Sequence, residues 1–342
     1  MSTSKTTFNS PQLTAMLLGA VSERAQDVLE KRFGLRGRDR MTLEAIGRGY
    51  GITRERVRQI ENFALNSIRK SDAYDQAISS LVELREHMND FGMIVREDDF
   101  LNHLADDEDE KNHLSFYLVL GNDFYRLKED AAFYHRWTTD QTLASKVQTA
   151  LRSLRGGLKN DDVLNEDEMI ECFRTHLRQE LGSSPDDHAQ RWLSLSKAID
   201  RNPLGGWGIS NSPNIKIRGM RDMAYLVIRD HGSPMHFREV AAAIKKLFGR
   251  SAHEATCHNE LIKDKRFVLV GRGLYALSSW GYARGTVRDV IAEMLKSNGP
   301  LSKDDIVSRV LKERYVKENT IAVNLQNGRH FGRDDNGRYF AL

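Results

Sequence analysis

The chain has 342 residues, which predicts two to four domains, and its 40% hydrophobic residues, 25 glycines and 6 prolines exclude a disordered or fibrous protein. Its two cysteines, Cys172 and Cys257, exclude a disulfide framework or a four-cysteine zinc site and fit a reducing compartment. The formal net charge is +3, yet residues 1–70 and 201–342 are basic and residues 71–200 are acidic, which favours two polyanion-binding ends.

The first apolar run, residues 13–21, is too short to span a bilayer. Its apolar residues recur at the spacing of one helical face, which favours an amphipathic helix over a signal-peptide core. We therefore expect a protein of the cytoplasm that does not contact a membrane.

The basic segment 22–70 predicts a helix-turn-helix. Three helices begin at the capping residues Ser22, Thr42 and Thr53, Gly34 ends the first, and Gly51 supplies the turn between the second and third. A helix, a short glycine turn and a second helix are typical of this motif. Gly47 is expected to let the helices of the motif approach closely.

The third of these helices separates apolar from polar side chains. At 100° per residue the apolar sector contains Val57, Ile60 and Ala64. The opposite side contains Arg54, Glu55, Arg58 and Gln59. Charged and amide groups near a helix N-terminus are typical of proteins that read bases in the major groove.

The motifs TLEAIG at 42–47 and TRERVRQIE at 53–61 closely resemble region four of bacterial housekeeping sigma factors. The resemblance covers about 50 residues. It implies recognition of the promoter −35 element in double-stranded DNA and packing against the flap of the RNA polymerase β subunit. It implies base readers at Arg54, Glu55 and Gln59, and phosphate contacts at Thr53, Arg56 and Arg58.

A complete sigma factor also needs a helix rich in aromatic and basic residues that melts the −10 element. No such helix precedes the segment, and the four tryptophans are scattered at Trp137, Trp192, Trp207 and Trp280. Full sigma activity is therefore not expected.

The acidic middle of the chain divides into two segments. Segment 72–140 predicts helices over 72–90 and 98–104, a solvated acidic loop at 106–110, and a possible hairpin formed by 114–120 and 124–127. This order weakly resembles a winged helix. Segment 141–205 is expected to be helical, with a break at Gly156 and Gly157 and a new start at Asn165. Residues 202–219 are expected to form a hinge or an extended connector in which Trp207 is a packing anchor.

Segment 206–283 predicts three helices followed by a β-hairpin, which is the order of a winged helix. The stretches SPMHFREVAAAI at 233–244 and KDKRFVLVGRGLYALSSWGY at 263–282 resemble the HARE helix-turn-helix family. Members of that family include the N-terminal domain of the RNA polymerase delta subunit and modules of chromatin and restriction proteins.

Segment 284–342 repeats this pattern at an offset of 64 residues. The matched pairs are Thr256 and Thr320, Leu261 and Leu325, Phe267 and Phe331, Gly273 and Gly337, and Tyr275 and Tyr339. The stretch from Pro300 likewise resembles the stretch from Pro234. The repeat predicts a second, C-terminal winged helix.

Polar side chains opposite the predicted cores are candidates for further DNA contacts, although they also fit the solvated side of a small domain or a polymerase-binding surface. The earlier copy contributes His258, Asn259, Lys263 and Arg272. The terminal copy contributes Lys317 at a helix start, Thr320, Asn324 and Asn327 on one expected helical face, and Arg338 in the hairpin.

Signatures of enzymes are weak. His253 and His258 are five residues apart, which places them about 140° apart around a helix and not on one face as a zinc-protease motif requires. The sequence contains no phosphate-binding GxxxxGK[ST] loop and no recognisable nucleophile or nuclease cluster. We expect no catalytic residue, no metal and no cofactor.

Together these patterns predict a mainly α, multidomain array of helix-turn-helix and winged-helix modules with small β-hairpin wings. The expected modules are 1–71, 72–140, 141–205, 206–283 and 284–342. The favoured function is sequence-specific DNA binding in bacterial transcription, as a sigma-like factor or a regulator. One alternative is a polymerase accessory protein of the delta type with little DNA specificity, and another is a targeting subunit for a separate DNA-modifying or DNA-cutting enzyme.

Overall fold

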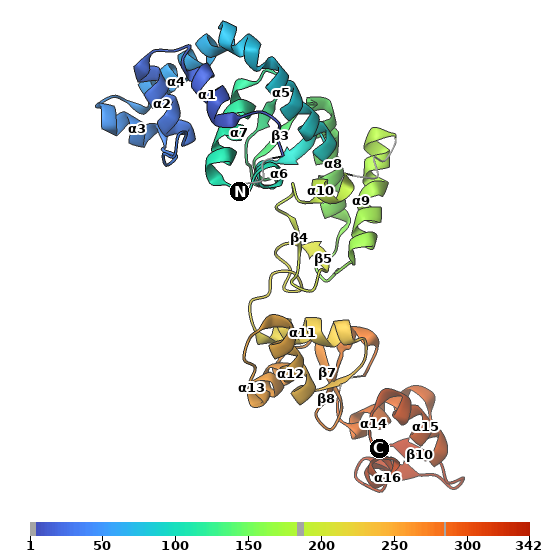
Figure 1. The fold of residues 1–342 in the computed structure, drawn as a ribbon. Helices are drawn as coiled ribbons and strands as arrows, with labels where there is room; N and C mark the ends of the chain where they lie inside the picture. The colour runs from blue at the N-terminus through green and yellow to red at the C-terminus, as the bar shows by residue number, and fades with distance from the viewer. Residues whose placement is uncertain (1–4, 183–187, 284) are drawn as a thin grey trace. The chain divides into compact units, whose positions relative to one another are not determined.

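Helices dominate the described residues, and the strands there pair in small sheets of two or three strands. The structure is a computed structural model that describes residues 5–182, 188–283 and 285–342. It confirms the expected mainly α fold class (Figure 1). The chain separates into two compact units, one formed by residues 1–159 with 164–200 and the other by residues 160–163 with 201–342.

The N-terminal helix-turn-helix has the predicted form. Its helices are α1 (Ser10–Leu18), α2 (Glu23–Phe33), α3 (Leu43–Tyr50) and α4 (Arg54–Arg69). Thr42 and Thr53 cap α3 and α4 by accepting hydrogen bonds from backbone N–H groups three residues later. Ser22 occupies the N-cap of α2 but makes no side-chain capping bond there, in contrast to the expectation. A small core of Val28, Ile46 and Val57 joins the three helices α2, α3 and α4.

Gly47 is required by the turn between α3 and α4. A Cβ atom at this position would lie 2.6 Å from the carbonyl oxygen of Ile52. The close approach is therefore between α3 and the backbone that leads into α4. Gly49, two residues later on α3, has no atom within 4 Å of the corresponding point.

The first winged helix follows directly. It consists of α5 (Asp72–Phe91), β1 (Ile94–Arg96), α6 (Glu97–Leu104), α7 (Glu108–Leu120), β2 (Tyr125–Leu127) and β3 (Arg136–Thr138). The strand order β1-β3-β2 is antiparallel, with Val95 and Arg126 both paired to Trp137. The weak winged-helix pattern at 72–140 thus corresponds to a complete helix-strand-helix-helix-strand-strand unit.

Two expectations for this segment are wrong. Residues 114–120 are not a strand, because they form the C-terminal half of α7 and are buried on nearly every side. A helix that is apolar all around gives the same sequence pattern as a buried strand. The acidic residues 106–110 are not simply a solvated loop, because Asp107 caps α7 and its successors form the first turn, where negative charge stabilises the helix dipole.

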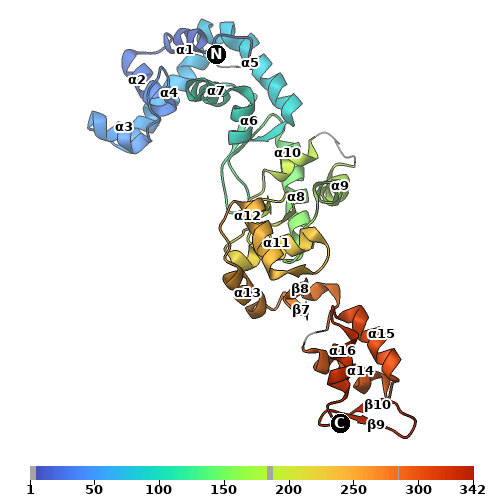
Figure 2. The ribbon, with the colours of Figure 1, turned by 60° about the horizontal axis from the view of Figure 1, so that its bottom comes forward.

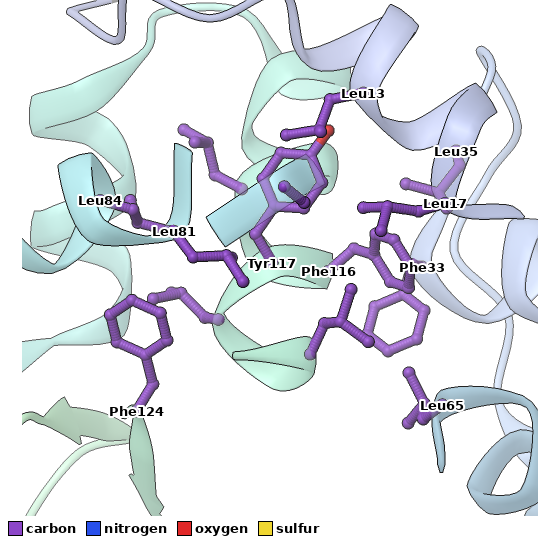
Figure 3. Packing of buried hydrophobic residues seen from close by; sticks show 14 of the residues in the cluster. Leu13, Leu17, Phe33, Leu35, Leu65, Leu81, Leu84, Phe116, Tyr117 and Phe124 are labelled. Carbon is purple, nitrogen blue, oxygen red and sulfur yellow. The ribbon is translucent and has the colours of Figure 1, made fainter. Parts of the chain in front are cut away.

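The helix-turn-helix and the first winged helix share one hydrophobic core. Leu17 of α1, Phe33 of α2 and Leu65 of α4 pack in the same cluster as Phe116 of α7 and Leu84 of α5 (Figure 3). The cluster surrounds α7, which explains why that helix has no polar face along its second half.

A buried polar network ties α1 to α7 inside this core. The Thr14 hydroxyl lies 2.7 Å from His113 Nδ1 and 2.6 Å from the Tyr117 hydroxyl, which donates to the Ser10 carbonyl. Burial lowers the pKa of His113, although the nearby Asp109 carboxylate acts in the opposite direction. The neutral imidazole is therefore the form that suits the folded state.

After the first winged helix come α8 (Gln141–Gly157), α9 (Glu166–Leu181), the short α10 (Ala189–Leu193), β4 (Ile199–Arg201) and β5 (Trp207–Ile209). Asn165 starts α9 with a reciprocal capping box to Glu168, as the sequence indicates.

The expected hinge at 202–219 is wrong in part, because much of this segment is folded and buried. The Asn202 side chain accepts hydrogen bonds from the backbone of Leu204 and Gly206 and donates one to the Asn214 carbonyl. Trp207 is only 6% exposed, consistent with a packing anchor. Side-chain amides supply the hydrogen bonds that a regular sheet would otherwise provide.

Two further winged helices complete the chain, as predicted (Figure 2). The earlier of these two copies contains α11 (Met220–His231), β6 (Met235–His236), α12 (Phe237–Phe248), α13 (Glu254–Lys263), β7 (Phe267–Gly271), β8 (Leu274–Leu277) and a 3₁₀ turn (Ser278–Trp280). The second contains α14 (Val287–Asn298), α15 (Lys303–Glu313), α16 (Glu318–Leu325), β9 (Phe331–Arg333) and β10 (Tyr339–Ala341).

The repeat detected in the sequence is also a structural repeat. Met235 pairs with Tyr275 in one copy, and Leu301 pairs with Tyr339 in the other. The glycine before each tyrosine adopts a left-handed backbone, with φ of 72° at Gly273 and 77° at Gly337. Each hairpin turn needs this conformation, which only glycine adopts without strain.

The two C-terminal copies also contact each other through backbone. The amide of Tyr315 donates a 2.7 Å hydrogen bond to the Val270 carbonyl in the hairpin of the preceding copy. Arg314, only 2% exposed, donates to the Ala283 and Gly285 carbonyls. The wing of one module therefore supports the corner between α15 and α16 of the next.

Replacing Gly47 with alanine should destabilise the α3–α4 turn by about 1–3 kcal/mol, because the new methyl group would overlap the Ile52 carbonyl. Hydrogen exchange of the α3 and α4 amides measures this local free energy. Gly49→Ala on the same helix is the control and should be neutral or slightly stabilising. Equal protection in the two variants would contradict the steric role of Gly47.

Stability should fall as the pH drops below the ordinary His113 pKa of about 6.5. Below that pH the unfolded chain binds a proton on His113, whereas the buried imidazole of the folded chain resists protonation. The free energy of unfolding therefore decreases as the pH falls. The fall in Tm between pH 7.5 and pH 5.5 should be smaller in His113→Asn than in the wild type. Identical falls in the two proteins would show that another group controls the pH dependence.

Candidate nucleic-acid interface

The predicted DNA-reading residues all lie at the solvent-exposed start of α4. Thr53, Arg54, Glu55, Arg56, Arg58 and Gln59 are exposed, whereas Val57 between them is fully buried. Burial of Val57 in the small core with Ile46 fixes the rotation of this part of the helix. The six polar side chains are thereby presented together on a rigid support.

Four of these side chains pair with each other in the free chain. Arg58 donates two hydrogen bonds to Glu55, at 2.7 and 2.9 Å, and Arg56 donates one to Gln59 at 3.0 Å. The first pair lowers the pKa of Glu55 and raises that of Arg58. Exposed pairs of this kind are weak, so they hold the side chains in place without preventing exchange for base or phosphate partners.

Arg54 and Thr53 differ from the other four. Arg54 lines a hollow with Arg32, Thr42 and Glu44, which places it toward the N-terminal end of α3. The Thr53 oxygen accepts the Arg56 amide and caps α4, while its own hydroxyl hydrogen is still available to a phosphate.

Phe63 was not among the predicted contact residues. It lies on α4 one turn after Gln59, and the residue is 74% exposed. The signal in the sequence is a large aromatic residue on the polar side of the helix wheel, about 40° from Gln59. An exposed phenylalanine beside a reading face is suited to contact an apolar partner surface.

In the earlier C-terminal copy the structure separates the predicted contacts into two groups. Asn259 and Lys263 are exposed on α13, and Arg272 is exposed at the tip of the β7–β8 hairpin. The His258 ring instead stacks on Phe237 with centroids 4.5 Å apart and meets the edge of Tyr275. His258 therefore packs within the domain more than the other three residues.

In the terminal copy Lys317 occupies the N-cap position of α16 without a side-chain capping bond, and Thr320 and Asn324 lie on that helix, with the Asn324 amide donating to the Thr320 carbonyl. Asn327 does not continue this face, because α16 ends at Leu325, and the Asn327 side chain accepts the Arg329 amide in the following turn. An asparagine side chain stabilises a turn in this way and competes with helix continuation. Arg338 is exposed in the turn between β9 and β10.

Other kinds of site are not apparent in the described residues. Within residues 5–182, 188–283 and 285–342, no three His, Cys, Asp or Glu side chains gather closely enough to hold a metal ion. No helix among the described residues combines the length and apolarity needed to cross a membrane.

The fold and the exposed face define helix-turn-helix and winged-helix modules of the DNA-binding type. Comparison with known families agrees: residues 17–70 match the family "Sigma-70, region 4", and residues 218–280 match the HARE-HTH family, whose description includes "restriction endonuclease HTH domain". The fusion of a sigma region-four module to a HARE module is thereby confirmed.

Two curated sigma factors each match a short stretch of the chain. RNA polymerase sigma factor SigA of Listeria monocytogenes is 47% identical over 53 residues, which is 16% of this chain and 14% of the relative. RNA polymerase sigma factor RpoS of Coxiella burnetii is 48% identical over 52 residues, or 15% of each chain. The chain thus spans about one seventh of the length of these sigma factors.

The Glu55–Arg58 pair leads to a prediction about DNA affinity. Glu55→Gln removes a negative charge beside the expected phosphates and releases Arg58, so binding to any duplex should strengthen by about two- to tenfold at low salt. If Glu55 reads cytosine, preference among sequences should fall at the same time. Anisotropy titrations with two unrelated duplexes measure both effects, and weaker binding to both duplexes would contradict the prediction.

Proposed function

We propose that this chain is a DNA-binding protein of bacterial transcription, a sigma-like factor or a regulator that recognises a −35-like promoter element. The observation that carries the proposal is the exposed row of Arg54, Glu55, Arg58 and Gln59 on a capped helix within the region-four segment. We further propose that it is a binding protein rather than an enzyme and acts in the cytoplasm.

In the proposed complex the first turns of α4 enter the major groove. Arginine can donate two hydrogen bonds to guanine, glutamine can bond adenine at two atoms, and glutamate can accept from cytosine. Arg54, Gln59 and Glu55 offer these three chemistries. Thr53, Arg56 and Arg58 would hold the phosphates and set the register of the helix on the duplex.

The C-terminal winged helices would add a second grip on adjacent duplex or on polymerase. Residues 201–342 carry an excess of basic residues, and Lys263, Arg272 and Arg338 are exposed there. Linking two weak binding modules raises the effective concentration of the second once the first is bound. The N-terminal helix-turn-helix and the C-terminal winged helices, linked in one chain, would therefore bind one promoter more tightly than either part could bind it alone.

A second candidate function is that of a polymerase accessory protein with little DNA specificity. The exposed Phe63 favours a protein partner, and the flap of the polymerase β subunit is the partner that we propose. Co-purification with polymerase that survives nuclease and high salt would support it. Phe63→Ala should reduce that association, whereas Ile78→Ala, which alters another exposed apolar side chain on α5, should not.

The base-reading proposal predicts a sequence preference. In competition anisotropy at one fixed salt concentration, the full chain should prefer a duplex with a −35-like hexamer over the same duplex scrambled by about tenfold or more, or roughly 1.4 kcal/mol. Equal binding would favour the polymerase accessory function.

Two variants separate base reading from phosphate contact. Gln59→Ala should cost about 1–3 kcal/mol on the preferred duplex only, whereas Arg58→Ala should weaken binding to all duplexes and reduce the salt slope by about 1. Gln76→Ala on α5 makes the same chemical change at an exposed position outside α4 and serves as control. An unchanged preference in Gln59→Ala would remove this residue from the proposed reading set.

A further inference from the structure

A hollow of about 250 Å³ lies where the helix-turn-helix meets the first winged helix. Arg32 from the end of α2 and Arg40 from the following loop line one side. Glu97 of α6, Ser115 of α7 and Arg126 of β2 line the other. Both sides belong to one compact unit and share its core.

Positive charge exceeds negative charge in this hollow. Three guanidinium groups line it, together with a single carboxylate, Glu97. That carboxylate is already engaged, because it accepts hydrogen bonds from Arg126 at 3.2 and 3.3 Å and from Trp137 Nε1 at 2.7 Å. Arg32 finds its carboxylate partner in Glu61, which does not line the hollow.

Of the three arginines that line the hollow, Arg40 is the one that makes no ion pair with a described residue. Among the described residues no carboxylate lies within 4 Å of its guanidinium, and its Nε donates only to the Phe33 carbonyl at 3.3 Å. Although the residue is exposed overall, enclosure of the guanidinium lowers its pKa. The Glu97 and Glu108 carboxylates oppose that effect, and the charges of Arg32 and Arg126 add to it. A negative charge placed in the hollow would relieve this repulsion.

Ser115 adds a second, independent sign of a missing partner. The residue is only 6% exposed, and its hydroxyl oxygen is buried without a hydrogen-bond partner among the described residues. Buried hydroxyl groups are nearly always hydrogen-bonded, so an unpaired one at the wall of a hollow indicates a site for a polar group. Phe33 and Trp137 supply apolar wall beside these polar groups.

We propose that this hollow binds the phosphate group of a small phosphomonoester. A planar guanidinium group can donate two parallel hydrogen bonds to two oxygens of one phosphate. The Ser115 hydroxyl can donate one further hydrogen bond. A dianion neutralises the excess charge of the site, and the apolar wall accommodates a small organic body. The volume is too small for a dinucleotide but sufficient for a phosphate with a compact substituent.

A DNA backbone phosphate is the competing source of the same chemistry. Arg32 and Thr42 also line the neighbouring hollow that contains Arg54 of the proposed reading face. The test must therefore separate a free phosphomonoester from duplex DNA, and it does not depend on the proposed promoter function.

The experiment is calorimetric titration of the full chain with phenyl phosphate and with inorganic phosphate at constant ionic strength. Both probes should bind, and phenyl phosphate should bind more tightly because of the apolar wall. Arg40→Gln should weaken both by about tenfold or more, and Ser115→Ala by a few-fold. Arg48→Gln, which removes an exposed arginine of α3 outside the hollow, should leave both unchanged.

Two outcomes would overturn the proposal. One is no binding of either probe, or equal binding by wild type, Arg40→Gln and Arg48→Gln. The other is a loss of duplex affinity in Arg40→Gln without any binding of the small probes, which would assign the site to backbone phosphate. Matching far-UV circular dichroism of the variants confirms that a loss of binding is not a loss of fold.

Discussion

Burial of one side of α4 is the constraint on which the rest of the N-terminal helix-turn-helix depends. Val57 anchors the N-terminal half in the small core with α2 and α3, and Leu65 and Ile68 anchor the C-terminal half in the large core around α7. Because both halves are fixed, the polar residues between Arg54 and Gln59 cannot rotate away from solvent. The proposed reading face is thus a consequence of packing, and it is connected to the acidic winged helix through the same core.

The chain uses the winged-helix unit repeatedly with different surfaces. Each of the three winged helices described has the same order of helices. In each, an early strand or bridge pairs with the last strand. Apolar positions such as Tyr275 and Tyr339 are shared because the core requires them. Charge is not shared, since segment 72–140 is acidic and the C-terminal winged helices are basic. The common fold therefore does not by itself fix what each winged helix binds.

Several local patterns were sufficient to predict elements correctly. Thr42, Thr53 and Asn165 cap helices where the sequence places them, and Gly273 and Gly337 form the hairpin turns. These features act through contacts within a few residues, so neighbouring sequence determines them. Segment 114–120 and the hinge at 202–219 were mispredicted because their structure depends on partners far along the chain, such as the cluster around α7.

The sequence by itself determined the mainly α fold class, the order of the region-four and HARE segments, and the residues that define the proposed reading face, because amphipathic periodicity and capping are local physics. Only the tertiary structure decided which faces are covered. Leu65 falls about 20° from Arg54 on a helical wheel, yet it is buried and Arg54 is exposed, because the two ends of α4 pack against different partners. The arginine-lined hollow likewise exists only in three dimensions, since Arg40, Ser115 and Arg126 come from segments whose proximity depends on the shared core.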